Sequence, residues 1–424
     1  MRHRTGRSVA LVLAATAALA VSTTVAAAPA PPGPDDLVIR FENIETHARA
    51  HSPRARPPEH ALAAILSERH QALRWSNPAL AYDHEQSPDF TEWQLSLHKR
   101  FSRPLGGGER RLAWDARVES AELRRDQRLR ELVVSLRAGY VELRLLTEHL
   151  DRLARLAGLI DLTAEAAASR HREGDLAGLD RQLIERTAYT VDATRRQLQA
   201  RHRRQLAAWR ADMGIPAGQP LALASPVGRL ELDLEPLRAG PSPLAQTAAV
   251  RSQAALGRSL GLEAAASRTG LLPALEIYGG YRRFAPGDDG LVAGVALELP
   301  ILDRGDDTAG QFLARQRELE SELAADLSRR EHQVRALLAS IIETEARLDE
   351  QAERIGAGAA TTDRLGDTLL VSFQEGAISL SGLLNAVQIE AGAIEARHEE
   401  LGAHYRNVFE LEAITGLDLV RPQP

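Results

Sequence analysis

Long heptad patterns constrain this chain more than any other feature of its sequence. Apolar residues recur at every seventh position from Leu129 to Ala157, and a second column follows from Leu132 to Ile160. Two later segments repeat in the same way, from Leu327 to Ile355 and from Leu380 to Val408. Sustained spacing of this kind is typical of helices that pack side by side in a left-handed coil. One helix is predicted from about residue 108 to 171, with a length on the order of 95 Å at 1.5 Å per residue.

The chain is also built as two similar halves. Pro104 matches Pro300, and the Glu-Gly pair at 173–174 matches the pair at 375–376, each match spanning roughly 200 residues. Each half is predicted to contain a helix, a β-hairpin, a very long helix, a glycine-containing turn and a return helix. The predicted organisation is a signal peptide at 1–27, an N-terminal segment at 28–58, a first repeat at 59–213, a proline-rich linker at 214–242, a second repeat at 243–416 and a tail at 417–424.

Both hairpins, predicted over 78–101 and 273–301, have one apolar and one polar or small-residue face. Strands of about ten residues with this alternation are typical of membrane β-barrels, although a hairpin that is half-buried in a soluble domain gives the same pattern. Ser96 and Ala296 lie on the polar face and are expected to tolerate an arginine. The residues predicted to face lipid are Trp93, Leu95, Leu97, Val295, Leu297 and Leu299.

The first residues are predicted to be an export signal. Three arginines precede a short apolar stretch, and small residues follow, with cleavage expected after Ala27. The alternative, a membrane anchor, needs a longer apolar run of roughly 20 residues. No cysteine is present, which excludes disulfides and thiolate metal sites. A formal net charge of −6 offers no basic footprint, so nucleic acid is not an expected partner.

Four amphipathic strands are too few to close a membrane barrel, since single-chain barrels begin at about eight strands. Open sheet edges cannot face lipid, because their backbone N–H and C=O groups would lack partners. A chain with these hairpins in a membrane must therefore oligomerise. Two copies would supply eight strands and three would supply twelve, and the strand pattern alone does not choose between them.

Several motifs resemble those of the TolC outer-membrane efflux family over nearly the whole mature chain. They are the Asn-Pro-Ala-Leu sequence at 77–80, the Pro-Ile-Leu-Asp-Arg-Gly junction at 300–305 and the pattern of Phe373, Gly376, Ser379 and the leucines at 383–384. The first junction, at 104–108, lacks the Asp-Arg pair, and the first turn has Ala177 where the second has Ser379. The resemblance implies a mainly α fold with a small β part, in which long coiled-coil hairpins form a trimeric α-barrel below a 12-stranded outer-membrane β-barrel.

The same resemblance implies a function and a set of partners. Such a protein is a homotrimeric, passive outer-membrane duct of a Gram-negative cell and extends into the periplasm, where the segments 28–58 and 214–242 would lie. A periplasmic adaptor protein joins it to an inner-membrane pump, here by resemblance a pump of the resistance-nodulation-division (RND) type that exports metals or drugs. The adaptor would dock at two tips, 172–179 and 373–380. The tip residues implied in docking are Arg172, Glu173, Gly174, Asp175, Phe373, Glu375, Gly376 and Ser379.

Candidate chemistry is sparse. His47 and His51 have the i, i+4 spacing of a helical zinc pair, but no third ligand stands nearby and they are expected to be solvent-exposed. His398 shares a heptad column with Leu384 and Tyr405, which predicts a packed side chain. No phosphate loop, nucleophile elbow or metalloprotease motif is present. The sequence therefore predicts no enzyme, no cofactor and no metal site.

Two other functions remain open from the residues alone. A periplasmic adaptor also has a coiled-coil hairpin, but it carries one such hairpin in a small β-rich domain, whereas this chain has two. A structural coiled-coil protein of an export complex would explain the heptads and would leave the alternating strands unexplained.

Overall fold

The structure, a computed structural model, describes residues 37–421 except for 87–90, 102–106, 173–177, 224–229, 239–242, 269–273, 286, 299–304, 357–370, 374 and 376. The predicted signal peptide lies outside the described residues. The main elements are α1 (Ile44–His51), α2 (Arg56–Leu73), β2 (Ala79–Gln86), β3 (Thr91–Phe101), α3 (Gly107–Arg172), α4 (Gly178–Met213), α6 (Ala248–Arg268), β6 (Ala274–Ala285), β7 (Asp288–Glu298), α7 (Asp306–Gly356) and α9 (Leu380–Thr415). The short elements are β1 (Leu37–Ile39), β4 (Leu221–Leu223), β5 (Glu231–Leu232), α5 (Glu235–Arg238), β8 (Val420–Arg421) and three 3-10 turns, Phe41–Asn43, Pro53–Ala55 and Pro243–Gln246.

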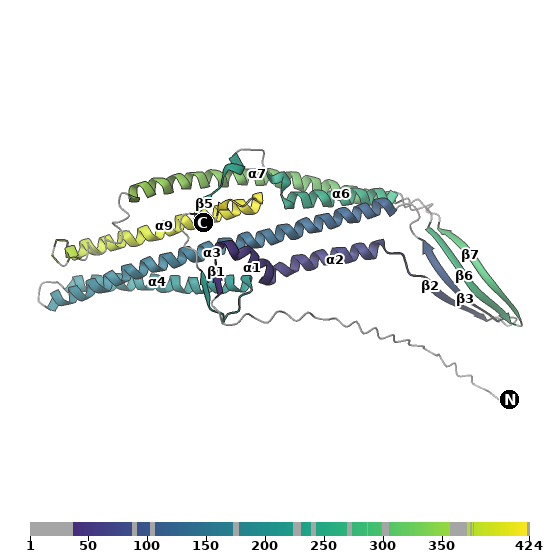
Figure 1. Ribbon diagram of the computed structural model, residues 1–424, viewed down its shortest axis with the longest axis horizontal. Coiled ribbons are helices and arrows are strands. Elements are labelled where there is room, and N and C mark those ends of the chain that lie inside the picture. The colour runs from purple at the N-terminus through teal and green to yellow at the C-terminus, as the bar shows by residue number, and fades with distance from the viewer. Residues whose placement is uncertain are drawn as a thin grey trace, which may run out of the picture.

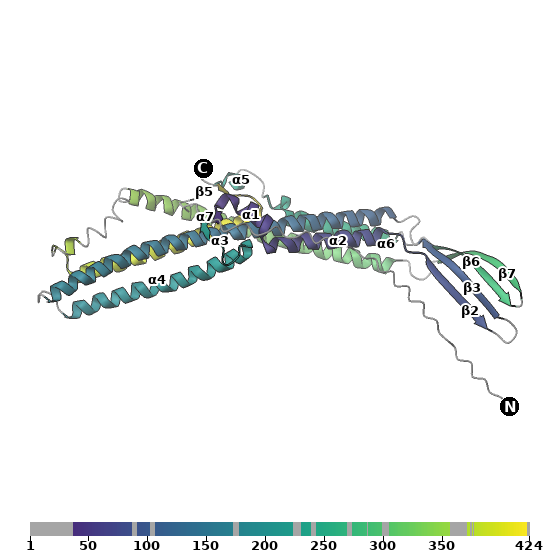
Figure 2. The same cartoon turned by 60° about the horizontal axis from the view of Figure 1, so that its bottom comes forward.

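The molecule is elongated, with a four-stranded sheet at one end and helical tips at the other (Figure 1). Helix α3 is 66 residues long and spans most of this length, about 100 Å at 1.5 Å per residue. It packs against α2 and α6 in its part near the sheet and against α4 and α9 in its part near the tips (Figure 2). The mainly α fold with a small β part, predicted from the sequence, is confirmed. None of the described helices combines the length and the apolar composition needed to cross a membrane.

Two glycines at matching positions of the two halves end the return helices. Gly214 follows α4 and Gly416 follows α9, and both have the left-handed backbone that favours glycine, with φ of 75° and 70°. At Gly214 there is also no space for a side chain, because a Cβ would lie 2.2 Å from the carbonyl oxygen of His51. The matched helix ends support the internal duplication read from the sequence.

Two separate apolar clusters hold the helices together. The larger lies at the middle of the rod and includes Tyr140 of α3, Trp209 of α4 and Phe409 of α9. The smaller lies nearer the tips, between Leu153 and Ala167 of α3 and Leu380 and Val387 of α9. We call them the central core and the tip core. The leucine columns of the sequence line both cores, as their heptad spacing predicted.

The central core is closed by short strands. β1 pairs in parallel with β4, and β5 pairs antiparallel with β8, so that residues 221–223 and 231–232 of the predicted linker and residues 420–421 of the predicted tail are held in short sheets. These parts were predicted to be a linker and a tail, without the strands. Runs of two or three residues give no usable periodicity, and their partners are far away in sequence.

The sheet has the order β2-β3-β6-β7 with antiparallel neighbours throughout. Each half of the chain contributes one hairpin, and the two hairpins join where β3 pairs with β6 along its whole length, from Thr91 opposite Ala285 to Phe101 opposite Leu275. β2 and β7 are the outer strands. The sheet projects beyond the helices, which leave both of its faces uncovered in the two views (Figures 1 and 2).

Candidate membrane surface and helical tips

The strand register brings the large apolar residues of all four strands to one face. Leu97 lies opposite Leu80, and Leu95 opposite both Tyr82 and Tyr281, while Val295 and Leu297 of β7 lie opposite Ile277 and Leu275. These side chains are exposed: Leu97 by 52 %, Leu297 by 58 % and Val295 by 62 %. Of the residues predicted to face lipid, the first five share this apolar face, and Leu299 lies outside the described residues.

Aromatic pairs mark both ends of the apolar face. Near the hairpin loops, the rings of Trp93 and Tyr281 are 5.6 Å apart. Near the helices, Trp75 meets Phe101 edge to face at 5.7 Å. Between the two pairs β3 carries Leu95, Leu97 and, next to Phe101, Lys99, whose ammonium group donates a hydrogen bond to the Ser76 carbonyl. Strands with an apolar band between two aromatic ends match the cross-section of an outer-membrane barrel wall, in which aromatic girdles lie at the two interfaces.

The opposite face of the sheet is polar and internally bonded. His98 Nε2 lies 2.8 Å from the Ser96 hydroxyl, and its Nδ1 lies 2.7 Å from Glu276 across the β3–β6 joint. Arg282 and Glu92 form an ion pair across the same joint. The Ser-His-Glu order resembles that of a hydrolase triad. However, Ser96 is only 1 % exposed, and a substrate carbonyl could not reach its hydroxyl. The hydrogen-bonded row of Ser96, His98 and Glu276, which we call the polar ladder, therefore connects the two strands.

Close packing against glycine fixes this ladder. A Cβ on Gly280 would lie 2.8 Å from Cα and Cβ of Ser96, and a Cβ on Gly294 would lie 2.4 Å from the ring of Tyr278. Tyr278 therefore lies over Gly294, its partner on β7, and stacks on His98 at 5.2 Å. Ser96 was expected to tolerate an arginine. Its near-complete burial against β6 argues against that expectation, whereas Ala296 is exposed.

The two tips are described in part. Arg172 is the exposed last residue of α3, and Glu173, Gly174, Asp175 and Gly376 lie outside the described residues. In the second tip Glu375 and Ser379 are exposed, and the Ser379 hydroxyl caps α9 by accepting a hydrogen bond of 3.1 Å from the Gly382 amide.

Phe373 has a different position from the other described tip residues. Its side chain is 1 % exposed and belongs to the tip core, so it anchors the turn from inside. The tip surface that a partner could contact therefore consists, among the described residues, of Arg172, Glu375 and Ser379 with their neighbours.

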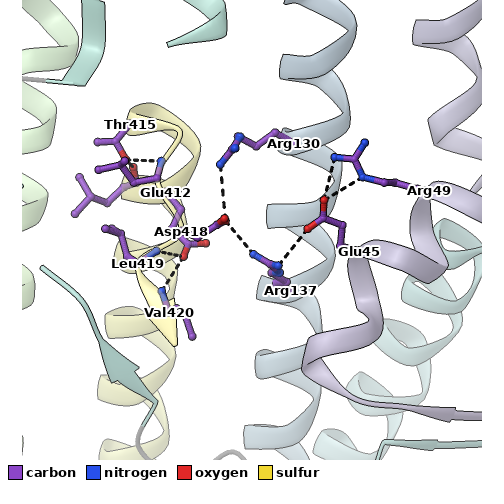
Figure 3. A network of polar contacts seen from close by, with 11 residues as sticks. Glu45, Arg49, Arg130, Arg137, Glu412, Thr415, Asp418, Leu419 and Val420 are labelled. Atoms are coloured by element: carbon purple, nitrogen blue, oxygen red, sulfur yellow. Dashed lines mark hydrogen bonds and ion pairs between the residues drawn. The ribbon is translucent and has the colours of Figure 1, made fainter. Parts of the chain in front are cut away.

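A polar network that the sequence did not reveal joins the C-terminal segment to the rod (Figure 3). Arg137 of α3 lies 3.1 Å from Asp418 and 3.4 Å from Glu45 of α1, which also pairs with Arg49. Beside it, buried Glu412 accepts hydrogen bonds from the backbone amides of Leu419 at 2.7 Å and Val420 at 3.0 Å. Burial raises the pKa of Glu412, and the two amides oppose that rise.

The candidate histidines differ in burial: His51 is exposed, as expected, whereas His47 and His398 are partly buried. His47 and His51 have ring centroids 4.6 Å apart. His47 is half-buried, contrary to the expected exposure, because it lies against the end of α4, where the Met213 carbonyl accepts its hydrogen bond. His398 was predicted to be packed, and this is confirmed, since its ring lies 4.7 Å from that of His149. Among the described residues no three histidines or carboxylates come together as a metal site would require.

Comparison with known proteins places the fold. No family model and no curated protein matches the sequence. Among solved structures, the chain resembles the CmeC outer-membrane channel of Campylobacter jejuni, with a TM-score of 0.72 and 11 % identity over 91 % of this chain and 87 % of that one. It also resembles the outer-membrane protein VceC of Vibrio cholerae, with a TM-score of 0.69 and 15 % identity over 89 % and 96 % of the two chains. A membrane protein from Pseudomonas aeruginosa gives a TM-score of 0.74 and 13 % identity over 89 % and 93 %. The chain therefore has the fold of the TolC-like outer-membrane channels, as the sequence motifs predicted.

Proposed function

We propose that this protein is the outer-membrane channel of a tripartite efflux system and forms a passive duct from the periplasm to the exterior. The observation that carries the proposal is the sheet: its apolar face is exposed, has aromatic pairs at both ends and stands at the end of a rod about 100 Å long. In water such a face would be a large uncovered patch, whereas in lipid it is the outer surface of a barrel wall. The polar face then lines the pore.

The sheet edges argue for several copies. β2 and β7 are the outer strands of the chain's own sheet, and a β-edge within a bilayer has unpaired backbone groups. Pairing β7 of one copy with β2 of the next would satisfy both edges. Three copies would give twelve strands, in keeping with the fold, and the helices would close a second barrel in the periplasm.

The remaining partners follow from the orientation of the rod. With the sheet in the outer membrane, the tips point toward the inner membrane. Exposed Arg172, Glu375 and Ser379, together with Glu173, Gly174, Asp175 and Gly376, would meet a periplasmic adaptor, and the adaptor would connect the duct to a pump of the RND type. The duct itself catalyses nothing and needs no cofactor, and the signal peptide 1–27 would be removed on export.

The adaptor alternative accounts for less of the molecule. A periplasmic adaptor does not account for a four-stranded sheet with an exposed apolar face, on which Leu97 is 52 %, Val295 62 % and Leu291 90 % exposed. A structural coiled coil has the same difficulty. Both alternatives predict a protein that stays in the periplasmic fraction.

Expression of the full chain in a Gram-negative cell tests the proposal. We expect the protein in the outer-membrane fraction as a trimer that survives detergent, with its N-terminus at Ala28, and purified trimers should conduct ions across a planar bilayer. A variant lacking both hairpins (79–101 and 274–298) controls for adventitious membrane association. A soluble periplasmic monomer would contradict the proposal.

A further inference from the structure

Three histidines from three helices lie at one level of the rod, at the boundary between the central core and the tip core. His149 of α3 lies between Leu145 of the central core and Leu153 of the tip core. His202 of α4 lies between Leu206, packed on the central core, and Leu198, packed on the tip core. His398 of α9 lies between Ala391 and Leu401, which pack on the tip core and the central core. We call this set the histidine layer.

Each histidine of the layer contacts a neighbouring helix through its imidazole ring. His149 is only 6 % exposed, its ring centroid is 4.7 Å from that of His398, and its Nδ1 has no hydrogen-bond partner among the described residues. The His398 ring donates a hydrogen bond to the backbone carbonyl of Leu145 on α3. His202 Nε2 lies 3.3 Å from the Thr147 hydroxyl. The layer therefore ties α9 and α4 to α3 through neutral imidazoles.

The charges around the layer balance. Facing it are Glu142, Arg144, Glu148, Asp151 and Arg152 of α3, Arg201 of α4, and Arg397 and Glu399 of α9, four acidic and four basic groups. Arg201 and Glu142 pair with each other at 2.9 Å, and on the α7 side Arg347 lies 3.6 Å from Glu400. A proton added to His149 would thus place a charge beside the His398 imidazole and near Arg152, whereas at His398 the carboxylates of Glu142 and Glu399 offset part of the cost.

Burial lowers the pKa of all three histidines, with His398 adding to the effect at His149, whose pKa falls to about 4. As the pH falls from 6.5 toward the lowered pKa, the open state binds protons that the closed state does not. Acid therefore destabilises the closed packing of these histidines. Glu148 acts in the opposite direction, because burial raises its pKa and it takes up a proton more readily when packed.

We propose that the histidine layer is an acid-sensitive joint, at which protonation separates α9 from α3 and frees the tip-side helices while the central core stays closed. If the protein is the proposed channel, this joint makes opening of its periplasmic end easier when the periplasm is acidified. The two cores on either side share no member residues, so loosening at the layer need not spread into the central core.

Hydrogen–deuterium exchange of the intact trimer at pH 7.5 and pH 5 tests the joint. After correction for the intrinsic rate, peptides from 380–400 of α9 should exchange roughly 30-fold faster at pH 5, the factor given by a pKa of about 4 in the closed state against 6.5 in the open state. Peptides from 403–415 should change by less than about 2-fold, because local opening leaves the central core folded.

Matched variants separate the layer from general acid effects. The variant His149→Gln/His398→Gln should lose the acid response of 380–400, whereas His332→Gln, an exposed histidine on α7, should keep it. Glu148→Gln should make the acid response larger. If the double variant does not form trimers, His398→Gln alone replaces it and should weaken the response.

Each outcome decides a different claim. The proposed acid-sensitive joint would be contradicted if the histidine-to-glutamine variants at 149 and 398 kept the acid response. It would also be contradicted if exchange accelerated equally in 380–400 and 403–415. Conductance of bilayer-inserted trimers at the two pH values addresses the function separately. An acid response in exchange without any conducting trimers would leave the joint standing and contradict the proposed channel.

Discussion

The rod and the sheet of this protein bury opposite kinds of side chain. In the rod, Leu136 and Leu143 of α3 are each 1 % exposed, whereas arginines such as Arg196 of α4 and Arg335 of α7 are exposed. In the sheet, Ser96 is 1 % exposed and its neighbour Leu97 is 52 % exposed. One chain thus follows two rules about which residues face inward. The difference indicates that the two regions meet different surroundings, since only in lipid is an apolar outer face the favourable one.

The two regions also gain specificity differently. The helices rely on apolar columns that interlock at heptad spacing. The sheet relies on register, because a shift by one residue would exchange its two faces. At the β3–β6 joint the polar ladder of Ser96, His98 and Glu276, with Tyr278 over Gly294, opposes such a shift.

The largest expected loss of stability comes from placing a charge on the apolar face of the sheet. Leu97→Arg places a charge on the apolar face and should cost roughly 2–4 kcal/mol of folding free energy if that face lies near the bilayer midplane. The measurement is urea-induced unfolding of protein refolded in lipid vesicles. Ala296→Arg, on the exposed polar face, is the matched control and should change stability little. Equal losses from both variants would mean that the apolar face does not meet lipid.

A second prediction concerns close packing in the rod. A Cβ on Gly139 of α3 would lie 2.8 Å from the Trp209 ring, whose Nε1 donates a 2.9 Å hydrogen bond to the Leu136 carbonyl. Gly139→Ala should therefore destabilise the protein by roughly 1–3 kcal/mol through overpacking. Gly158 of the same helix has nothing within 4 Å of such a Cβ, and Gly158→Ala should raise stability by about 0.5–1 kcal/mol through helix propensity. Thermal unfolding of the two variants gives the comparison.

The third prediction concerns the fastening of the C-terminal segment. Glu412→Ala leaves the buried amides of Leu419 and Val420 without their acceptor and should cost roughly 1–3 kcal/mol. Arg181→Ala removes an exposed i, i+4 pair with Glu185 on α4 and should cost no more than about 0.5 kcal/mol. Protease accessibility of β8 should increase only in the first variant. If both variants lost the same stability, the network in Figure 3 would have no special role.

These regions also differ in how far the sequence could predict them. Helix α3 was predicted over about 108–171 and runs from 107 to 172, and the first hairpin was predicted over 78–101 and its strands run from 79 to 101, because both carry a long, regular period. Arg137 and Asp418 could not be paired in advance, since 281 residues separate them and no pattern links them. The histidine layer shows the same limit: the heptad column indicated that His398 is packed, and only the fold brings it to His149.

The smallest effect on stability is expected at the tips, where the effect on function should be largest. Glu375 is exposed and caps no helix, so Glu375→Cys should change the free energy of unfolding by less than about 0.5 kcal/mol and leave trimers intact. Because the chain has no cysteine, this thiol is a unique crosslinking site in each copy. Under the proposed orientation it should crosslink to the periplasmic adaptor in cells, as should a cysteine at position 173, and larger changes at Glu375 should reduce export. A cysteine at Gly287, in the turn between β6 and β7 at the far end of the sheet, is the control and should give no adaptor crosslink. Strong adaptor crosslinks from that turn, with none from either tip, would show that the rod points the other way. The sheet and not the tips would then face the adaptor.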